Sequence, residues 1–216
     1  SLDGRFVVIP NGYDETTFSD LPVTVDRRPR RPLRLVHSGI LYPEGRNPLP
    51  FFNALADLKA AGALSEEDVA IVLRASGSEA MYTEEIRRRG LDRMITLAPP
   101  ISNREALHEQ FDADALLLFQ GRQYDRQIPA KVYEYLRIGR PIFALVGEDG
   151  DTAALLRRAG GATLVPPDDV AAIARGLREF VQALRDERAP AANASVVQEY
   201  SRHHGAVLLA RLLDEV

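Results

Sequence analysis

The sequence contains no cysteine, few histidines and no long hydrophobic run. The absence of cysteine excludes disulfide bonds, thiolate zinc sites and thiol nucleophiles, and it fits a reducing compartment. The four histidines show no spacing typical of metal ligands, so we expect no metal site. Because no stretch reaches the roughly 18 apolar residues that a membrane span needs, we expect no transmembrane segment.

The chain also lacks the excess of positive over negative charge that would suit a nucleic acid. Its net charge is −4, which argues against nucleic-acid binding as the main function. Lysine occurs only at Lys59 and Lys131, since arginine supplies the other basic side chains. The chain begins at Ser1 without an initiator methionine or a recognisable secretory leader, so we interpret residues 1–216 as one domain of a longer, cytoplasmic protein.

Short apolar runs alternate with helical patterns along about 180 residues. Most of the runs are continuously apolar, which is typical of parallel strands covered on both faces. The pattern therefore predicts an α/β fold, a Rossmann-like parallel sheet with helices on both faces, whose ligands bind at the carboxyl ends of the strands. Strands are expected at residues 5–9, 33–37, 69–74, 94–98, 113–119, 141–146 and 162–165, an exposed connector at 20–32, and helices at 49–61, 78–89, 102–111, 129–139, 151–159, 170–188 and 191–215, the last with a break near 203–205.

The loop that follows the strand ending at His37 is the first candidate site. Gly39 allows the backbone to approach a ligand closely, and Arg46 lies just before a helix, where a phosphate would also meet free backbone N–H groups. An ordinary turn with a solvated arginine explains the same residues. The loop contains no G-x-G-x-x-G pattern, so a dinucleotide cofactor is not supported.

The start of the helix expected at residues 129–139 is the second and stronger candidate. Lys131 and Glu134 lie three residues apart and share one helix face. A lysine in the first turn opposes the helix dipole, which suggests an anion held by both. Glu134 is suited to accept hydrogen bonds from sugar hydroxyls. A surface Lys–Glu pair is the alternative interpretation.

The turn at residues 99–102 is a third candidate, in which Ile101 would line a base pocket through backbone atoms. A stiff Pro-Pro turn followed by Ser102 as N-cap, with Glu105 completing a capping box, explains these residues equally well. We interpret His37, at the end of a buried strand, as a structural histidine.

Four segments together resemble the C-terminal domain of GT-B glycosyltransferases of the group-1, or family-4, type. The resemblance covers essentially the whole chain, and the order of the segments is more specific than any one of them. They are residues 8–14 with Phe18, residues 38–46, residues 128–135 with 139–142, and residues 200–213.

The resemblance implies the C-terminal half of a GT-B fold that binds a nucleoside-diphosphate sugar, without a cofactor or metal. It implies that Arg46 and Lys131 stabilise the leaving diphosphate, that Gly39 lies beside it, that Glu134 binds the ribose and that Ile101 meets the base. The donor-binding residues expected in this way are Gly39, Ile101, Arg126, Ile128, Pro129, Lys131 and Glu134.

Two positions depart from the family pattern. Many members have an arginine directly after the loop glycine, where this chain has Ile40. Many also have a second glutamate, eight residues before the one that binds ribose, where this chain has Arg126 with Asp125 beside it. Arg46 either takes over part of the positive charge that is missing at Ile40 or corresponds to a lysine that family members have later in the loop.

The resemblance further implies a bacterial enzyme of cell-surface polysaccharide synthesis, a hexosyltransferase that acts with retention. An absent N-terminal domain would hold the glycan or lipid acceptor and make any peripheral contact with the inner face of the membrane, so the isolated chain should be inactive. The alternatives are a nucleotide-sugar epimerase of similar architecture and a non-catalytic, ligand-binding α/β domain.

Overall fold

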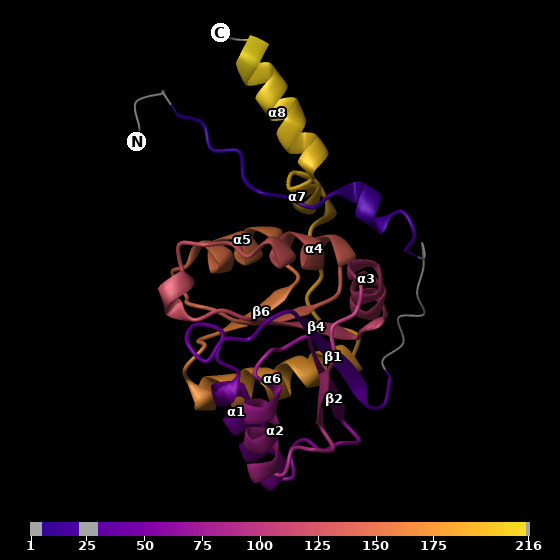
Figure 1. Ribbon diagram of the computed structural model, residues 1–216, viewed down its shortest axis with the longest axis vertical. Coiled ribbons are helices and arrows are strands. Elements are labelled where there is room, and N and C mark those ends of the chain that lie inside the picture. The colour runs from indigo at the N-terminus through magenta and orange to yellow at the C-terminus, as the bar shows by residue number, and fades with distance from the viewer. Residues whose placement is uncertain (1–5, 22–29, 215–216) are drawn as a thin grey trace.

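The structure, a computed structural model, describes residues 6–21 and 30–214 and has a six-stranded sheet at its centre (Figure 1). The strand order is β3-β2-β1-β4-β5-β6, and every neighbouring pair is parallel, as the sequence predicted. The strands are β1 (Leu33–Ser38), β2 (Val69–Arg74), β3 (Ile95–Ala98), β4 (Ala115–Phe119), β5 (Ile142–Leu145) and β6 (Ala162–Val165).

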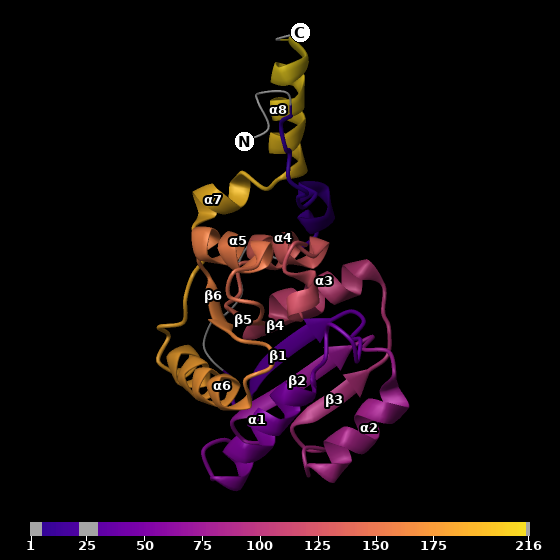
Figure 2. The same ribbon diagram turned by 90° about the vertical axis from the view of Figure 1, so that its left-hand side faces the viewer.

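Helices cover both faces of this sheet, which explains why its strands are continuously apolar (Figure 2). All five residues of β4 are buried: Leu117 and Phe119 belong to the core cluster on one face, and Leu116 and Leu118 to the cluster on the other. On one face lie α1 (Leu49–Ala60), α2 (Glu79–Arg88) and α6 (Val170–Arg185); on the other lie α3 (Asn103–Asp112), α4 (Ala130–Ile138), α5 (Asp151–Ala159) and, packed on α4 and α5, α7 (Ala194–Gln198).

The winding direction of the chain reverses between two neighbouring strands. From β1 the chain adds β2 and β3 on one side, and then returns to place β4 on the other side of β1. In sheets of this kind the crevice outside the carboxyl ends of the two strands at the reversal is the usual ligand site. The loops after β1 and β4 are therefore neighbours.

The strand expected at residues 5–9 is wrong for the part that the structure describes. Residues 6–12 form no regular element, and Val8 is 87% exposed. This segment runs outside the sheet, where no neighbouring strand supplies hydrogen bonds (Figure 1). An apolar run alone does not distinguish a buried strand from an exposed segment. Arg5 and residues 22–29 of the expected connector lie outside the described residues.

The C-terminal helix is divided earlier than expected. Its two parts are α7 and α8 (Arg202–Asp214), and the break lies at residues 199–201 instead of 203–205. At the break the N–H of Tyr13 donates to the carbonyl of Tyr200 at 3.0 Å, and the N–H of Arg202 donates to the carbonyl of Tyr13 at 2.9 Å. The N-terminal segment thus uses the backbone groups that a continuous helix would have paired internally. Residue 215 lies outside the described residues.

Gly176 allows α6 to lie directly on the sheet, and its replacement tests how tight this contact is. A Cβ at Gly176 would lie 2.6 Å from Cγ1 of Val165 and 3.5 Å from Cε2 of Phe143. We expect Gly176→Ala to lower the free energy of unfolding by about 1–3 kcal/mol, although alanine favours helices, because the added methyl overpacks the core. Urea unfolding measures this.

The exposed neighbour on the same helix supplies the control, since Arg175→Ala should change the free energy of unfolding little. Equal stability of Gly176→Ala and the wild type would mean that α6 can move away from β6 without cost.

Candidate functional site

The loop after β1 and the start of α4 meet at the reversal point of the sheet. The ammonium group of Lys131, in the first turn of α4, donates a hydrogen bond to the carbonyl oxygen of Ser38. The hydroxyl of Tyr135 accepts a hydrogen bond from the N–H of Ser38 at 3.2 Å. Two side chains of α4 therefore hold the last residue of β1, and they fix the position of Gly39 beside it.

Gly39 is required both by its backbone and by its neighbour. Its φ of +114° lies in a region that other residues rarely adopt. A Cβ there would lie 2.7 Å from Nζ of Lys131. Any side chain at this position would displace the lysine, so the glycine preserves the close approach of loop and ammonium group.

Two positive charges lie close together in this region. Burial and the neighbouring guanidinium of Arg46 lower the pKa of Lys131 to about 8, and Glu134 counteracts this in part. Among the described residues, no carboxylate forms an ion pair with Lys131 or Arg46, and the Arg46 guanidinium lies over the ring of Tyr42 at 5.4 Å. Two adjacent cations without a paired carboxylate form a site that favours an anion.

Glu134 lies one turn further along α4. Its carboxyl is half-buried, and burial raises its pKa, while Lys131 and Arg202 act in the opposite direction. The carboxyl is therefore close enough to Lys131 on one side and to Arg202, at the start of α8, for both charges to act on it. It is placed to accept hydrogen bonds from a ligand that extends out of the anion site.

One pocket of about 480 Å³ contains these groups. It opens at the carboxyl ends of β1 and β2 and is bounded by α3 and α4. Five of the predicted site residues line it: Gly39, Arg46, Ile101, Lys131 and Glu134. The full lining is Ser38, Gly39, Ile40, Tyr42, Arg46, Arg74, Ala75, Ile101, Asn103, Ala106, Gln110, Lys131, Glu134 and Tyr135.

The other three predicted site residues do not line this pocket. Arg126 is exposed in the loop between β4 and α4. Ile128 is partly buried against the core cluster under α4, and Pro129 is the N-cap residue of α4. Their expected roles in donor binding stay predictions.

The turn before α3 contains the capping box that the sequence predicted, while the role of Ile101 at a base stays a prediction. Ser102 and Glu105 form the expected capping box, with Ser102 Oγ accepting from the N–H of Glu105 and the Glu105 carboxylate accepting from the N–H of Ser102 at 2.9 Å. Ile101, 36% exposed, also lines the pocket. The capping box thus fixes where α3, which forms one wall of the pocket, begins.

His37 is the structural histidine that the sequence predicted. It is fully buried, and its Nδ1–H donates to the carbonyl of Leu117 at 2.9 Å. Burial, with Lys131 nearby, holds its pKa well below the ordinary value. The ring therefore remains neutral. Its hydrogen bond to Leu117 joins β1, just before the loop of the first candidate site, to β4.

Sequence reasoning did not single out Arg74 and Gln110 as site residues, although both line the pocket. A signal existed for Arg74, since a charged residue ends an otherwise apolar strand. Gln110 gave no signal, because a glutamine near the end of a polar helix is ordinary.

None of the helices in the described part of the chain combines the length and the hydropathy that crossing a bilayer requires. Within the same residues, no group of three or more His, Asp or Glu side chains lies together as metal ligands do.

The sheet order and the helices on both faces give the chain the fold of one Rossmann-like domain of the kind found in GT-B glycosyltransferases. The chain matches a glycosyltransferase from Rickettsia africae with a TM-score of 0.67 and 14% identity over 97% of this chain and 56% of that chain. It matches the lipopolysaccharide outer core galactosyltransferase WaaB with a TM-score of 0.67 and 12% identity over the same shares. HepE of Anabaena, in complex with UDP and glucose, matches with a TM-score of 0.60 and 15% identity over 86% and 49%.

The chain thus spans about half the length of the solved chains that it matches. At this identity the likeness establishes the fold. The sequence itself matches no protein-family profile and no curated protein.

The lowered pKa of Lys131 predicts a distinct pH dependence of stability. Its pKa is about 8 in the folded chain and 10.5 for an unperturbed lysine, so between these values the unfolded chain binds the proton and the folded chain does not. Stability therefore rises as pH increases from about 8 to 10.5. We expect the wild type to gain up to about 3 kcal/mol relative to Lys131→Met over this window, as measured by urea unfolding at several pH values.

The other lysine provides the matched control, since Lys59, which donates to the carbonyl of Gly90 at 2.6 Å, lies outside the pocket lining. Lys59→Met should keep the alkaline gain. Parallel pH profiles for the wild type and Lys131→Met would contradict the burial of the ammonium group.

Proposed function

We propose that this chain is the donor-binding domain of a glycosyltransferase and binds a nucleoside-diphosphate sugar in the 480 Å³ pocket. The observation that carries the proposal is the pair of cations Arg46 and Lys131, which form no ion pair within the described residues and lie beside Gly39 with its positive φ. Gly39 and the two cations line the same pocket, which is the arrangement that a bound diphosphate would need.

The helix that bears Lys131 adds to this anion site. The first turn of α4 follows Pro129, which forms no side-chain cap hydrogen bond. The N-terminus of a helix carries a partial positive charge and free N–H groups that favour a phosphate. Lys131, which this dipole would otherwise destabilise, is compensated when an anion lies between the two.

The chemistry of sugar transfer fits these groups. When the glycosidic bond to the donor breaks, negative charge grows on the departing diphosphate. Arg46 and Lys131, fixed in advance by Tyr42 and by the Ser38 carbonyl, would stabilise this charge in the transition state. Glu134 would accept hydrogen bonds from the ribose. The pocket volume lies in the range of small-molecule sites, and the complex of the similar HepE with UDP and glucose supports the same ligand class.

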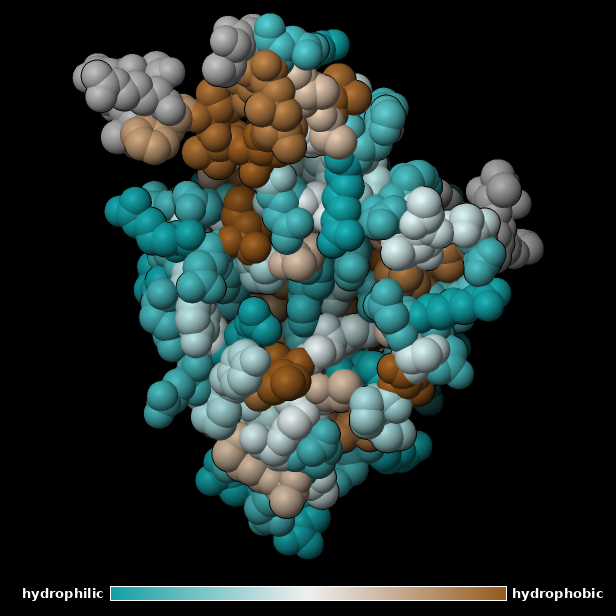
Figure 3. Space-filling view, turned by 45° about the horizontal axis from the view of Figure 1, so that its top comes forward, coloured by the Kyte–Doolittle hydropathy of each residue, from teal (hydrophilic) through white to brown (hydrophobic). Residues whose placement is uncertain are grey.

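An exposed apolar surface supports a second domain as the partner. Apolar side chains gather over α8 and the N-terminal segment (Figure 3), where Phe6 is 69%, Val8 87% and Leu213 68% exposed. In the described part of the chain, α8 has no buried residue. A helix with exposed apolar side chains and no buried residue is expected to pack against another domain or protein. We propose that this surface contacts the N-terminal GT-B domain, which would bind the glycan or lipid acceptor and complete the active cleft.

Binding of diphosphates to the isolated domain tests this function. Calorimetric titration with UDP, GDP, ADP and dTDP should show binding of at least one of them. A double variant, Lys131→Ala with Glu134→Ala, should weaken that binding by at least about tenfold, because it removes a charge-assisted contact.

Lys59→Ala is the control and should bind as the wild type does. The isolated chain should transfer no sugar, because the acceptor half of the cleft would be missing. Equal binding by the wild type and the double variant would overturn the proposed site, and sugar transfer by the chain alone would overturn the need for a second domain.

A further inference from the structure

The end of the pocket next to α3 contains an unusual polar group. The side chain of Gln110 lines the pocket, the residue is only 4% exposed, and its Oε1 has no hydrogen-bond partner in the described structure. Buried polar atoms are nearly always hydrogen-bonded, so such an atom calls for an explanation. The residue lines the pocket although this oxygen is closed to solvent, so a ligand in the pocket would supply the missing donor once the side chain turns toward it.

Gln110 belongs to one continuous face of α3. Asn103, Ala106 and Gln110 follow at intervals of three and four residues, so they lie above one another along the helix, and all three line the pocket. Ile101 precedes this face at the start of the helix. The side chains of this wall carry no charge, so it is the part of the pocket that would suit the uncharged portion of a nucleotide.

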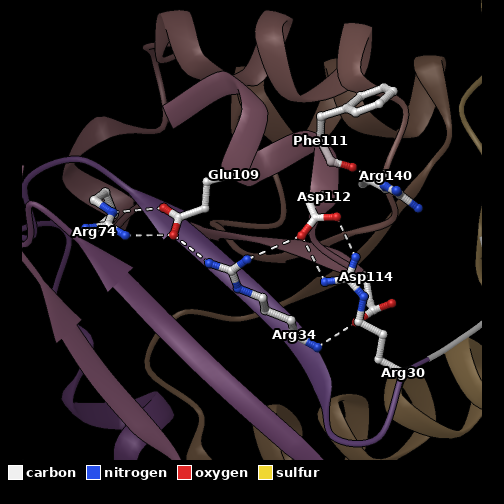
Figure 4. A network of polar contacts seen from close by, with 8 residues as sticks. All are labelled: Arg30, Arg34, Arg74, Glu109, Phe111, Asp112, Asp114 and Arg140. Carbon is white, nitrogen blue, oxygen red and sulfur yellow. Dashed lines mark hydrogen bonds and ion pairs between the residues drawn. The ribbon is translucent and has the colours of Figure 1, made fainter. Parts of the chain in front are cut away.

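Arg74, at the end of β2, is held rigidly in the same pocket. Its Nε and Nη2 donate to the carboxylate of Glu109 at 2.9 and 2.7 Å, and its Nη1 donates to the carbonyl of Pro99 at 2.7 Å. Glu109 also accepts a hydrogen bond from Arg34, in a network that continues along α3 (Figure 4). These contacts use three of the five N–H groups of a guanidinium.

The pairing of Arg74 separates the two ends of the pocket electrostatically. Arg74 forms an ion pair with Glu109, a carboxylate that it shares with Arg34, whereas Lys131 and Arg46 have no carboxylate in an ion pair among the described residues. Arg74 is thus a fixed hydrogen-bond donor, and a diphosphate would be attracted more strongly to Lys131 and Arg46. With the phosphates of a nucleotide at Lys131, the part of the pocket along α3 would be the space left for its base.

We propose that Gln110 and Arg74 recognise the nucleobase and select one that presents a carbonyl beside a ring N–H, as uracil, thymine and guanine do. This inference rests on the proposed function. The ring N–H would donate to Oε1 of Gln110, and the carbonyl would accept from Arg74. Adenine and cytosine lack a carbonyl next to a ring N–H, and an amino group there would face the N–H donors of Arg74. Such mismatches are what give polar sites their selectivity.

Calorimetric titrations with UDP, GDP, ADP, CDP and inorganic pyrophosphate test the proposal. The wild type should bind UDP or GDP about tenfold or more tightly than ADP and CDP. Gln110→Met keeps the volume of the side chain and removes its polar atoms. It should reduce that preference about tenfold, with a smaller effect on pyrophosphate, which has no base.

Arg74→Lys is the second variant, in case Gln110→Met does not fold. It keeps a positive charge beside Glu109 but loses the planar fork, and it should also reduce the preference for UDP or GDP. Unfolding curves identify which variants are folded. Loss of the preference in a folded variant supports the proposal.

Two results would overturn it while the proposed function stands: a wild type that binds ADP or CDP as tightly as UDP and GDP, or a folded variant that keeps the full preference. Lys131-dependent binding would persist in both cases. Failure of every diphosphate to bind at millimolar concentration would overturn the proposed function and this inference together.

Discussion

The contact between Lys131 and the carbonyl of Ser38 is the interaction on which the pocket depends. It joins the two loops that the reversal of the sheet brings together, and it requires glycine at position 39 because any Cβ would meet the ammonium group. Tyr135 supports the same peptide from the other side by accepting from the N–H of Ser38. The pocket floor is thus built from backbone groups whose positions are set by α4.

The cost of this arrangement is electrostatic. Placing Lys131 in a buried position, near Arg46 and in the first turn of a helix, opposes its positive charge in three ways. A fold tolerates such a conflict where a ligand resolves it. At the other end of the pocket Arg74 forms an ion pair with Glu109, whereas Arg46, near Lys131, forms none with a carboxylate of the described residues. The pocket therefore has a more positive end, at Lys131 and Arg46, which would orient an elongated ligand whose negative charge lies at one end.

Most of the fold could be predicted from the sequence because its strands are continuously apolar. Residues 69–74 and 162–165 were predicted with the bounds of β2 and β6, since a short apolar run that lies between two helical patterns favours a strand of a parallel sheet. Lys131 was predicted as a site residue because a cation in the first turn opposes the helix dipole, and Glu134 because it shares the same helix face. Gly39 was predicted because a glycine lets the loop backbone approach a ligand. Gln110 was missed because its significance lies in burial without a partner, which only the three-dimensional structure reveals.

The two errors at the ends of the chain have one physical cause. Residues 6–9 are apolar but do not form a strand. The last helix breaks at residues 199–201, where the backbone of Tyr13 hydrogen-bonds to Tyr200 and Arg202. The two segments hydrogen-bond to each other, and both leave apolar side chains exposed. Periodicity reports which side of an element is covered, but it does not report whether the cover comes from the same domain. The segments that the sequence described least well are therefore those whose apolar side chains a second domain is proposed to bury.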